Sequence, residues 1–134
     1  MLTASQLIRK ACLQYCLDHE TDDDDLGNFC GPFETIEQID AMEREVDDHC
    51  CDLLQEAKSE LRCGTHETGL RCETSRHYES KTVAMQIDGQ WVGWTYWFGG
   101  GKFGDPQAID WIEDAVLLDA VEETRVVLVF SERG

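Results

Sequence analysis

The chain has 134 residues and carries 28 Asp and Glu against 11 Lys and Arg, a formal net charge of −17 at pH 7. This charge argues against an unassisted nucleic-acid binder or a protein that binds anionic membranes, because phosphate contacts need Lys and Arg. It fits a protein whose partner is basic. The length predicts a single domain over residues 1–134, and a hydrophobic fraction of 42% is enough for a core.

The first predicted element is an amphipathic helix over residues 5–18, capped by Thr3 or Ser5. Its apolar residues recur at three- and four-residue spacing and form one face. Arg9 and Lys10 interrupt the start of the chain, so it does not have the pattern of a signal peptide, and no apolar run is long enough for a membrane helix. We therefore expect a cytoplasmic protein.

A longer helix is predicted over residues 35–61, after a loop that contains Asp22, Asp23, Asp24 and Asp25. Thr35 can cap this helix and Gly64 can end it. Its apolar residues keep a helical period for seven turns: Ile36, Ile39, Met42, Val46, Cys50, Leu53, Leu54, Ala57 and Leu61.

From about Leu70 the hydrophobic period changes to two, which predicts strands. Asp88-Gly89 is a strong signal for a two-residue hairpin turn between strands that end at Ile87 and begin at Gln90. The expected partners across this hairpin are Met85 with Val92, Val83 with Trp94, and Lys81 with Tyr96. That face should cover the helices, while Trp91 and Trp97 lie on the other face.

The remaining predicted elements are weaker. They are a first strand near residues 71–78, a glycine-rich loop over residues 99–104, a short helix over residues 105–112, and a final hairpin with strands over 115–121 and 125–131. Together the elements predict an α+β fold, in which two N-terminal helices pack on an antiparallel β-sheet of four to five strands built from hairpins.

The second predicted helix places four carboxylates in one row. Asp48, Asp52, Glu56 and Glu60 follow one another at intervals of four residues, which is about 6 Å along a helix. Like charges at this spacing destabilise a helix, and a regular row of them can imitate a row of phosphates. We expect this row to bind a partner, with the run of residues 22–25 extending the surface. The alternatives are a solvated face or an adaptation to high salt.

Two other clusters invite a functional interpretation. Cys63-x2-His66 followed by Cys72-x4-His77 offers thiolates and imidazoles to zinc, although the gap between the pairs is short for a zinc finger. Trp91 and Trp97 lie on the sheet face away from the helices, and we expect the rest of the chain, a homodimer partner or a target to cover them. The seven cysteines are otherwise expected to be reduced thiols, two of them, Cys12 and Cys16, in the core.

No arrangement of residues supports catalysis or a bound cofactor. The sequence GGGKFG, residues 99–104, lacks the Gly-Lys-Ser/Thr of a phosphate loop, because Phe103 follows Lys102. Carboxylates are so numerous that some pair always looks like an acid–base dyad. We therefore expect a protein that is not an enzyme and needs no cofactor.

One stretch resembles a known group of proteins. The segment WVGWTYWFGGGKFGDPQAIDWIEDAVLLD, residues 91–119, is similar to a segment of small uncharacterised acidic proteins from bacterial plasmids and conjugative elements. The resemblance implies a mobile-element context and no particular activity. Together with the carboxylate row, it leads us to expect a nucleic-acid mimic that inhibits a basic DNA- or RNA-binding partner, such as a host-defence nuclease. The alternatives are a homodimeric protein whose acidity serves solubility only, or a small zinc-binding domain.

Overall fold

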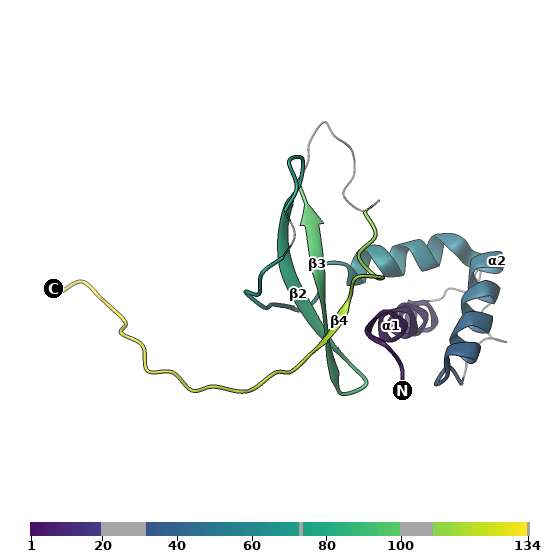
Figure 1. Cartoon of the computed structure of the whole chain (residues 1–134), viewed down its shortest axis with the longest axis horizontal. Helices are drawn as coiled ribbons and strands as arrows, with labels where there is room; N and C mark the ends of the chain where they lie inside the picture. The colour runs from purple at the N-terminus through teal and green to yellow at the C-terminus, as the bar shows by residue number, and fades with distance from the viewer. Residues whose placement is uncertain (20–31, 73, 100–108, 134) are drawn as a thin grey trace.

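The computed structural model describes residues 1–19, 32–72, 74–99 and 109–133. Within these ranges, two helices precede four strands: α1 (Ala4–His19), α2 (Ile36–Leu61), β1 (His66–Glu67), β2 (Glu79–Ile87), β3 (Gln90–Phe98) and β4 (Val116–Leu118). All neighbouring strands are antiparallel, and they lie in the order β1-β2-β3-β4 (Figure 1). The α+β fold with N-terminal helices that the sequence predicts is confirmed.

The β2–β3 hairpin forms with the predicted register. Val83 lies opposite Trp94, Met85 opposite Val92 and Lys81 opposite Tyr96. Asp88 and Gly89 make the turn with φ angles of 51° and 77°. A two-residue turn of this hand follows the right-handed twist of the strands and is therefore the favoured hairpin connection.

The capping box at the start of α2 is also confirmed. The Thr35 hydroxyl accepts a hydrogen bond from the Gln38 backbone N–H, and the Gln38 side chain accepts one from the Thr35 N–H. The helix is not straight, however, because Cys50 has the non-helical angles φ −154° and ψ 59°. Figure 1 shows the two halves of α2 on two sides of α1. The bend thus accompanies the packing of both halves against the same helix.

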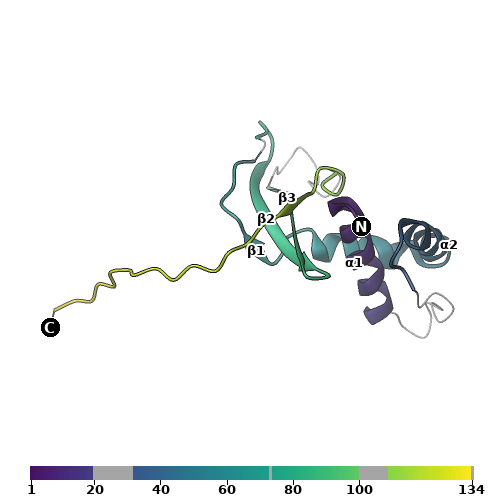
Figure 2. The same cartoon turned by 60° about the horizontal axis from the view of Figure 1, so that its bottom comes forward.

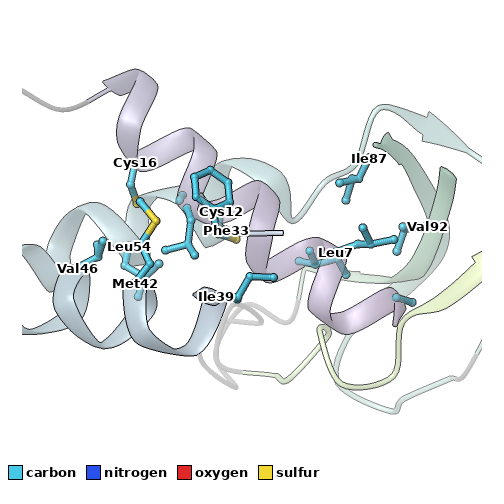
Figure 3. Close-up of a cluster of buried hydrophobic side chains, with 14 of the residues drawn as sticks. Leu7, Cys12, Cys16, Phe33, Ile39, Met42, Val46, Leu54, Ile87 and Val92 are labelled. Carbon is cyan, nitrogen blue, oxygen red and sulfur yellow. The ribbon is translucent and has the colours of Figure 1, made fainter. Parts of the chain in front are cut away.

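The position of α2 relative to the sheet differs in part from the one that we expected. We expected α2 to pack on the sheet; its C-terminal end reaches the sheet, but α1 lies between the first part of α2 and the sheet and contacts β2, β3 and β4 (Figures 1 and 3). Leu7 of α1 lies toward Ile87 and Val92 of the hairpin, whereas Cys16 lies toward α2. The core therefore continues through three layers, and α1, which is apolar on both sides, joins them.

A buried lysine connects these layers. Lys10 is only 8% exposed, and its Nζ donates to Glu34 Oε2 at 2.8 Å and to Asp88 Oδ2. Burial opposes the charged form, but the hydrogen bonds to Asp88 and Glu34 outweigh it and raise the pKa of Lys10. The contact holds the turn of the hairpin against α1 and the residues just before α2.

Three of the weaker predictions differ from the structure. The first strand is β1, ahead of the predicted residues 71–78, and Gly69 with φ 72° ends its pairing with β2 just past Thr68. The predicted helix over residues 105–112 lies partly outside the described residues. Its described part is a turn, in which Asp110 Oδ1 accepts from the backbone N–H groups of Ile112 and Glu113.

The final hairpin is the third difference. Its first strand shortens to β4, and residues 119–133 have no regular structure and lead away from the body of the molecule (Figures 1 and 2). The turn predicted at residues 122–124 contains no Gly or Asn to adopt a positive φ. The chain therefore does not reverse there.

None of the six cysteines in the described ranges is in a disulfide, and Cys12 and Cys16 are buried as predicted. Burial raises the pKa of the Cys12 thiol to about 12. Across the described part of the chain, neither helix is both long and apolar enough to cross a membrane.

Candidate functional site

The candidate partner-binding surface is the solvent side of α2 from just before Cys50 to the end of the helix. Asp48, Asp52, Glu56 and Glu60 are all exposed there, and we call these four residues the acidic face. The opposite side of the same helix buries Leu54 and Ala57 in the core. Burial of that apolar stripe fixes the rotation of the helix, and the carboxylates consequently face water.

The prediction of one uninterrupted row is wrong at Cys50. The non-helical backbone of this residue separates Asp48 from Asp52, so the interval of four residues is not a regular helical interval at that point. Asp52, Glu56 and Glu60 remain on one straight segment of about 12 Å. Neither Pro nor Gly stands at the bend, so no residue there signals it in the sequence.

No cation neutralises the acidic face within the described ranges. None of its four carboxylates takes part in an ion pair there, and the Asp52 carboxylate accepts only a long contact of 3.9 Å from the Cys51 thiol. The carboxylates are thus free to meet cations from another molecule.

Two carboxylates in the first half of α2, in contrast, have an ion-pair partner. Arg9 of α1 donates from Nε to Glu43 at 2.9 Å and from Nη2 to Asp40. Lys10 likewise binds Glu34 just before the helix. Arg9 and Lys10 therefore pair with carboxylates near the start of α2, whereas the four carboxylates of the acidic face form no ion pair within the described residues.

The negative charge of the acidic face affects the pKa of a residue on α1. Tyr15 lies near Glu56 and Glu60, and burial together with the charges of these two glutamates raises the pKa of its hydroxyl. Their charge therefore acts beyond the helix that carries them, as expected for carboxylates without counter-charges.

The other predicted partner-binding residues, Asp22, Asp23, Asp24 and Asp25, lie outside the described residues, as do residues 100–104 of the glycine-rich loop. Their part in the surface stays a prediction.

The two tryptophans of the possible interface differ in burial. Trp97 is 8% exposed in the single chain, so it offers a partner little area. Trp91 is half-buried; the His66 ring packs edge-on against it with centroids 5.1 Å apart, and Leu118 lies opposite it on β4. Much of this face of the sheet is thus covered by the chain itself.

The four candidate zinc ligands are not brought together. In the parts of the chain that the structure describes, no group of three or more Cys, His, Asp or Glu side chains could hold a metal ion. Cys63 Sγ contacts the Glu60 carbonyl at 3.6 Å, His66 Nδ1 lies 2.8 Å from the Thr65 hydroxyl, and Cys72 Sγ lies 3.5 Å from the Ser80 hydroxyl. These contacts tie the residues to different neighbours.

Sequence reasoning missed two features near the surface. Lys10 falls three residues after Leu7, on the apolar face of α1, and a lysine at such a position needs carboxylate partners. Arg62 follows α2, donates to the Trp97 carbonyl and lies over the Tyr96 ring, with its centre 4.9 Å from the ring centroid. Its Nε is buried without a hydrogen-bond partner. Neither cation is close enough in sequence to its partners for a local pattern to reveal the contact.

A pocket of about 330 Å³ lies between α1 and the β2–β3 turn. Lys10 lines it but is already held by two carboxylates, and Tyr15 and His19 stack on each other at its edge with ring centroids 3.9 Å apart.

No family model, curated protein or solved structure matches this chain.

Proposed function

We propose that the protein is a non-enzymatic inhibitor that acts in the cytoplasm and occupies the basic nucleic-acid-binding groove of another protein, such as a host-defence nuclease. The observation that carries the proposal is the acidic face. Its carboxylates are exposed and form no ion pair in the described residues, while Arg9 and Lys10 pair with other carboxylates. Such a surface attracts Lys and Arg side chains that otherwise bind phosphates.

The geometry limits what the acidic face imitates. Asp52, Glu56 and Glu60 lie about 6 Å apart on a straight helical segment, whereas the bend at Cys50 redirects Asp48. The mimicry therefore rests on three carboxylates in line, with Asp48 at an angle to them. Affinity for a basic groove should decrease steeply with salt, because the attraction acts between exposed charges.

The test is binding to a panel of basic nucleases and DNA-binding proteins, followed by competition with DNA. The variant Asp52→Lys/Glu56→Lys/Glu60→Lys should lose binding by at least an order of magnitude. The control Glu79→Lys/Glu113→Lys/Glu122→Lys changes the net charge by the same amount at exposed positions outside α2, and should retain most of the binding. Equal losses in both variants would show that total charge, and not the acidic face, is responsible.

Two further outcomes contradict the proposal. One is an absence of binding to every basic protein in the panel at low salt. The other is binding that leaves DNA bound to the partner, because a mimic and DNA must compete for one groove.

A further inference from the structure

Residues 126–130 are the longest run of exposed apolar side chains in the described part of the chain. Val126, Val127, Leu128, Val129 and Phe130 are between 69% and 100% exposed, and the segment leads away from the body of the molecule (Figure 2). Contiguous apolar side chains are rarely left in water, because burying them is strongly favourable. The described residues of the single chain therefore provide no surface that covers this segment.

The composition of the segment suits a strand. Val, Leu and Phe favour extended structure, and no Pro or Gly interrupts them. The side chains at odd and at even positions are all apolar, which is typical of a strand that is covered on both faces. Arg125 and Glu132 limit the apolar run to the length of one ordinary strand.

The sheet offers a place for such a strand at β4. This strand is at the end of the sheet, and it pairs with Trp91, Val92 and Gly93 of β3 on one side. No described residue pairs with its other side. Val116 and Leu117 are 53% and 46% exposed, so this edge is both unpaired and apolar.

Two grooves flank β4 and would take side chains from an added strand. One, of about 450 Å³, is lined by Trp91, Leu117 and Leu118. The other, of about 190 Å³, lies on one face of the sheet beside Gly93, Val116 and Leu118. Both grooves include Leu118, so an added strand could bury apolar side chains beside this residue of β4.

We propose that residues 126–130 of one copy pair as a strand with β4 of a second copy, which returns its own segment in the same way. Each chain carries both the strand and the edge, so a two-fold exchange completes both sheets at once. Pairing with the chain's own β4 would need a reversal at residues 122–124, which have no turn residues and run away from the body.

The charge of the protein gives this dimer a distinctive salt dependence. Each copy carries −17, so the copies repel each other at low salt and the dimer strengthens when salt screens that repulsion. Binding of a basic partner by the acidic face has the opposite dependence. The inference does not rest on the proposed function, and either can fail alone.

Light scattering of the full chain, at about 0.1 M and about 1 M salt, tests the proposal. We expect twice the single-chain mass of 15.3 kDa, with more dimer at the higher salt. Leu128→Pro removes a strand hydrogen bond and should give a monomer. Val121→Pro is the matched control, since Val121 is 84% exposed and Leu128 82%, and it should leave the dimer unchanged.

Leu128→Lys provides a second variant. It lowers the net negative charge and would favour association on electrostatic grounds alone, so its dissociation into monomers would identify the apolar strand as the contact. A wild-type chain of single-chain mass under all these conditions would overturn the proposal. So would open-ended assemblies in place of a dimer, or a dimer that survives both Leu128 substitutions with the helical circular dichroism signal intact.

Discussion

Residues 79–98 and residues 115–131 both contain strand-forming sequences separated by a short polar segment, but the first pair forms a hairpin and the second does not. The difference begins at the turn. Asp88 and Gly89 adopt positive φ, whereas residues 122–124 are Glu, Glu and Thr, which disfavour it. A strand-forming composition is thus not sufficient without a turn that reverses the chain.

Tertiary contacts increase the contrast. Val83, Val92 and Trp94 of the hairpin are buried against α1, and Lys10 holds the turn. Residues 126–130 have no comparable cover from the residues that the structure describes. The comparison indicates that the first hairpin belongs to the folding core, while the second apolar strand is available for pairing with another copy.

The largest expected loss of unfolding free energy comes from removing a buried side chain of the hairpin. Trp94 is 4% exposed, packs near Trp111 and donates from its indole N–H to the Arg62 carbonyl at 2.7 Å. Trp94→Ala should reduce the free energy of unfolding by about 3–5 kcal/mol. Leu128→Ala should change it by less than about 0.5 kcal/mol. Urea unfolding at a concentration where the chain is monomeric measures both, and similar losses would contradict the comparison.

The next largest change in unfolding free energy is expected from a substitution in the turn itself. Gly89 has φ 77°, and a β-branched residue is strained there, so Gly89→Val should cost about 1–3 kcal/mol of unfolding free energy. Gly89→Asn is the control, because Asn tolerates positive φ and should retain most of the stability. Nothing lies within 4 Å of the position where a Cβ would be added. A loss at Gly89→Val therefore reports backbone strain and not a steric clash.

The contact between Lys10 and Asp88 is expected to contribute less. Lys10→Met leaves Asp88 and Glu34 without their cation, but both carboxylates remain accessible to water, so we expect a loss of about 1–2 kcal/mol at pH 7. The folded-state pKa of Lys10 is raised above 10.5, so its contribution is present below that pH and is lost as pH rises through the folded-state pKa. The difference in unfolding free energy between wild type and Lys10→Met should therefore shrink above about pH 10.5. A constant difference up to pH 12 would contradict this account.

The smallest change in stability, and the sharpest test of the comparison, comes from giving the second segment a turn. Glu123→Asn with Thr124→Gly places Asn-Gly between Glu122 and Arg125, where a two-residue turn would set Val121 opposite Val126. We expect protection of the amides of residues 126–130 from hydrogen exchange in the monomer, and a stability gain of about 1 kcal/mol or less. Glu123→Asn alone is the control. Unchanged exchange in the double variant would show that the turn is not what separates the two segments.

Several features of the fold could be predicted from sequence because their signals are local. The Thr35 capping box, the Asp88-Gly89 turn and the register of β2 against β3 each depend on residues a few positions apart. The exposure of three carboxylates of the candidate site could also be predicted from sequence. The exposure of Asp52, Glu56 and Glu60 follows from the apolar stripe on the opposite side of α2.

The bend at Cys50, the central position of α1 and the pairing of Lys10 with Asp88 could not be predicted in this way. They depend on contacts between residues far apart in the chain, such as Lys10 and Asp88 at a separation of 78 positions. The sequence also did not reveal that two carboxylates of α2 are neutralised. Their partner, Arg9, lies on another helix and pairs with Asp40 and Glu43.

The sequence by itself determined the net charge, the helical and strand periods, and the turn that joins β2 to β3, because periodicity and turn chemistry act over a few residues. The tertiary structure decided which carboxylates keep their charge uncompensated and which apolar strand stays exposed. Both outcomes depend on contacts between residues far apart in the chain: Arg9 pairs with Asp40 and Glu43 of α2, and α1 covers the apolar side chains of the β2–β3 hairpin but not residues 126–130.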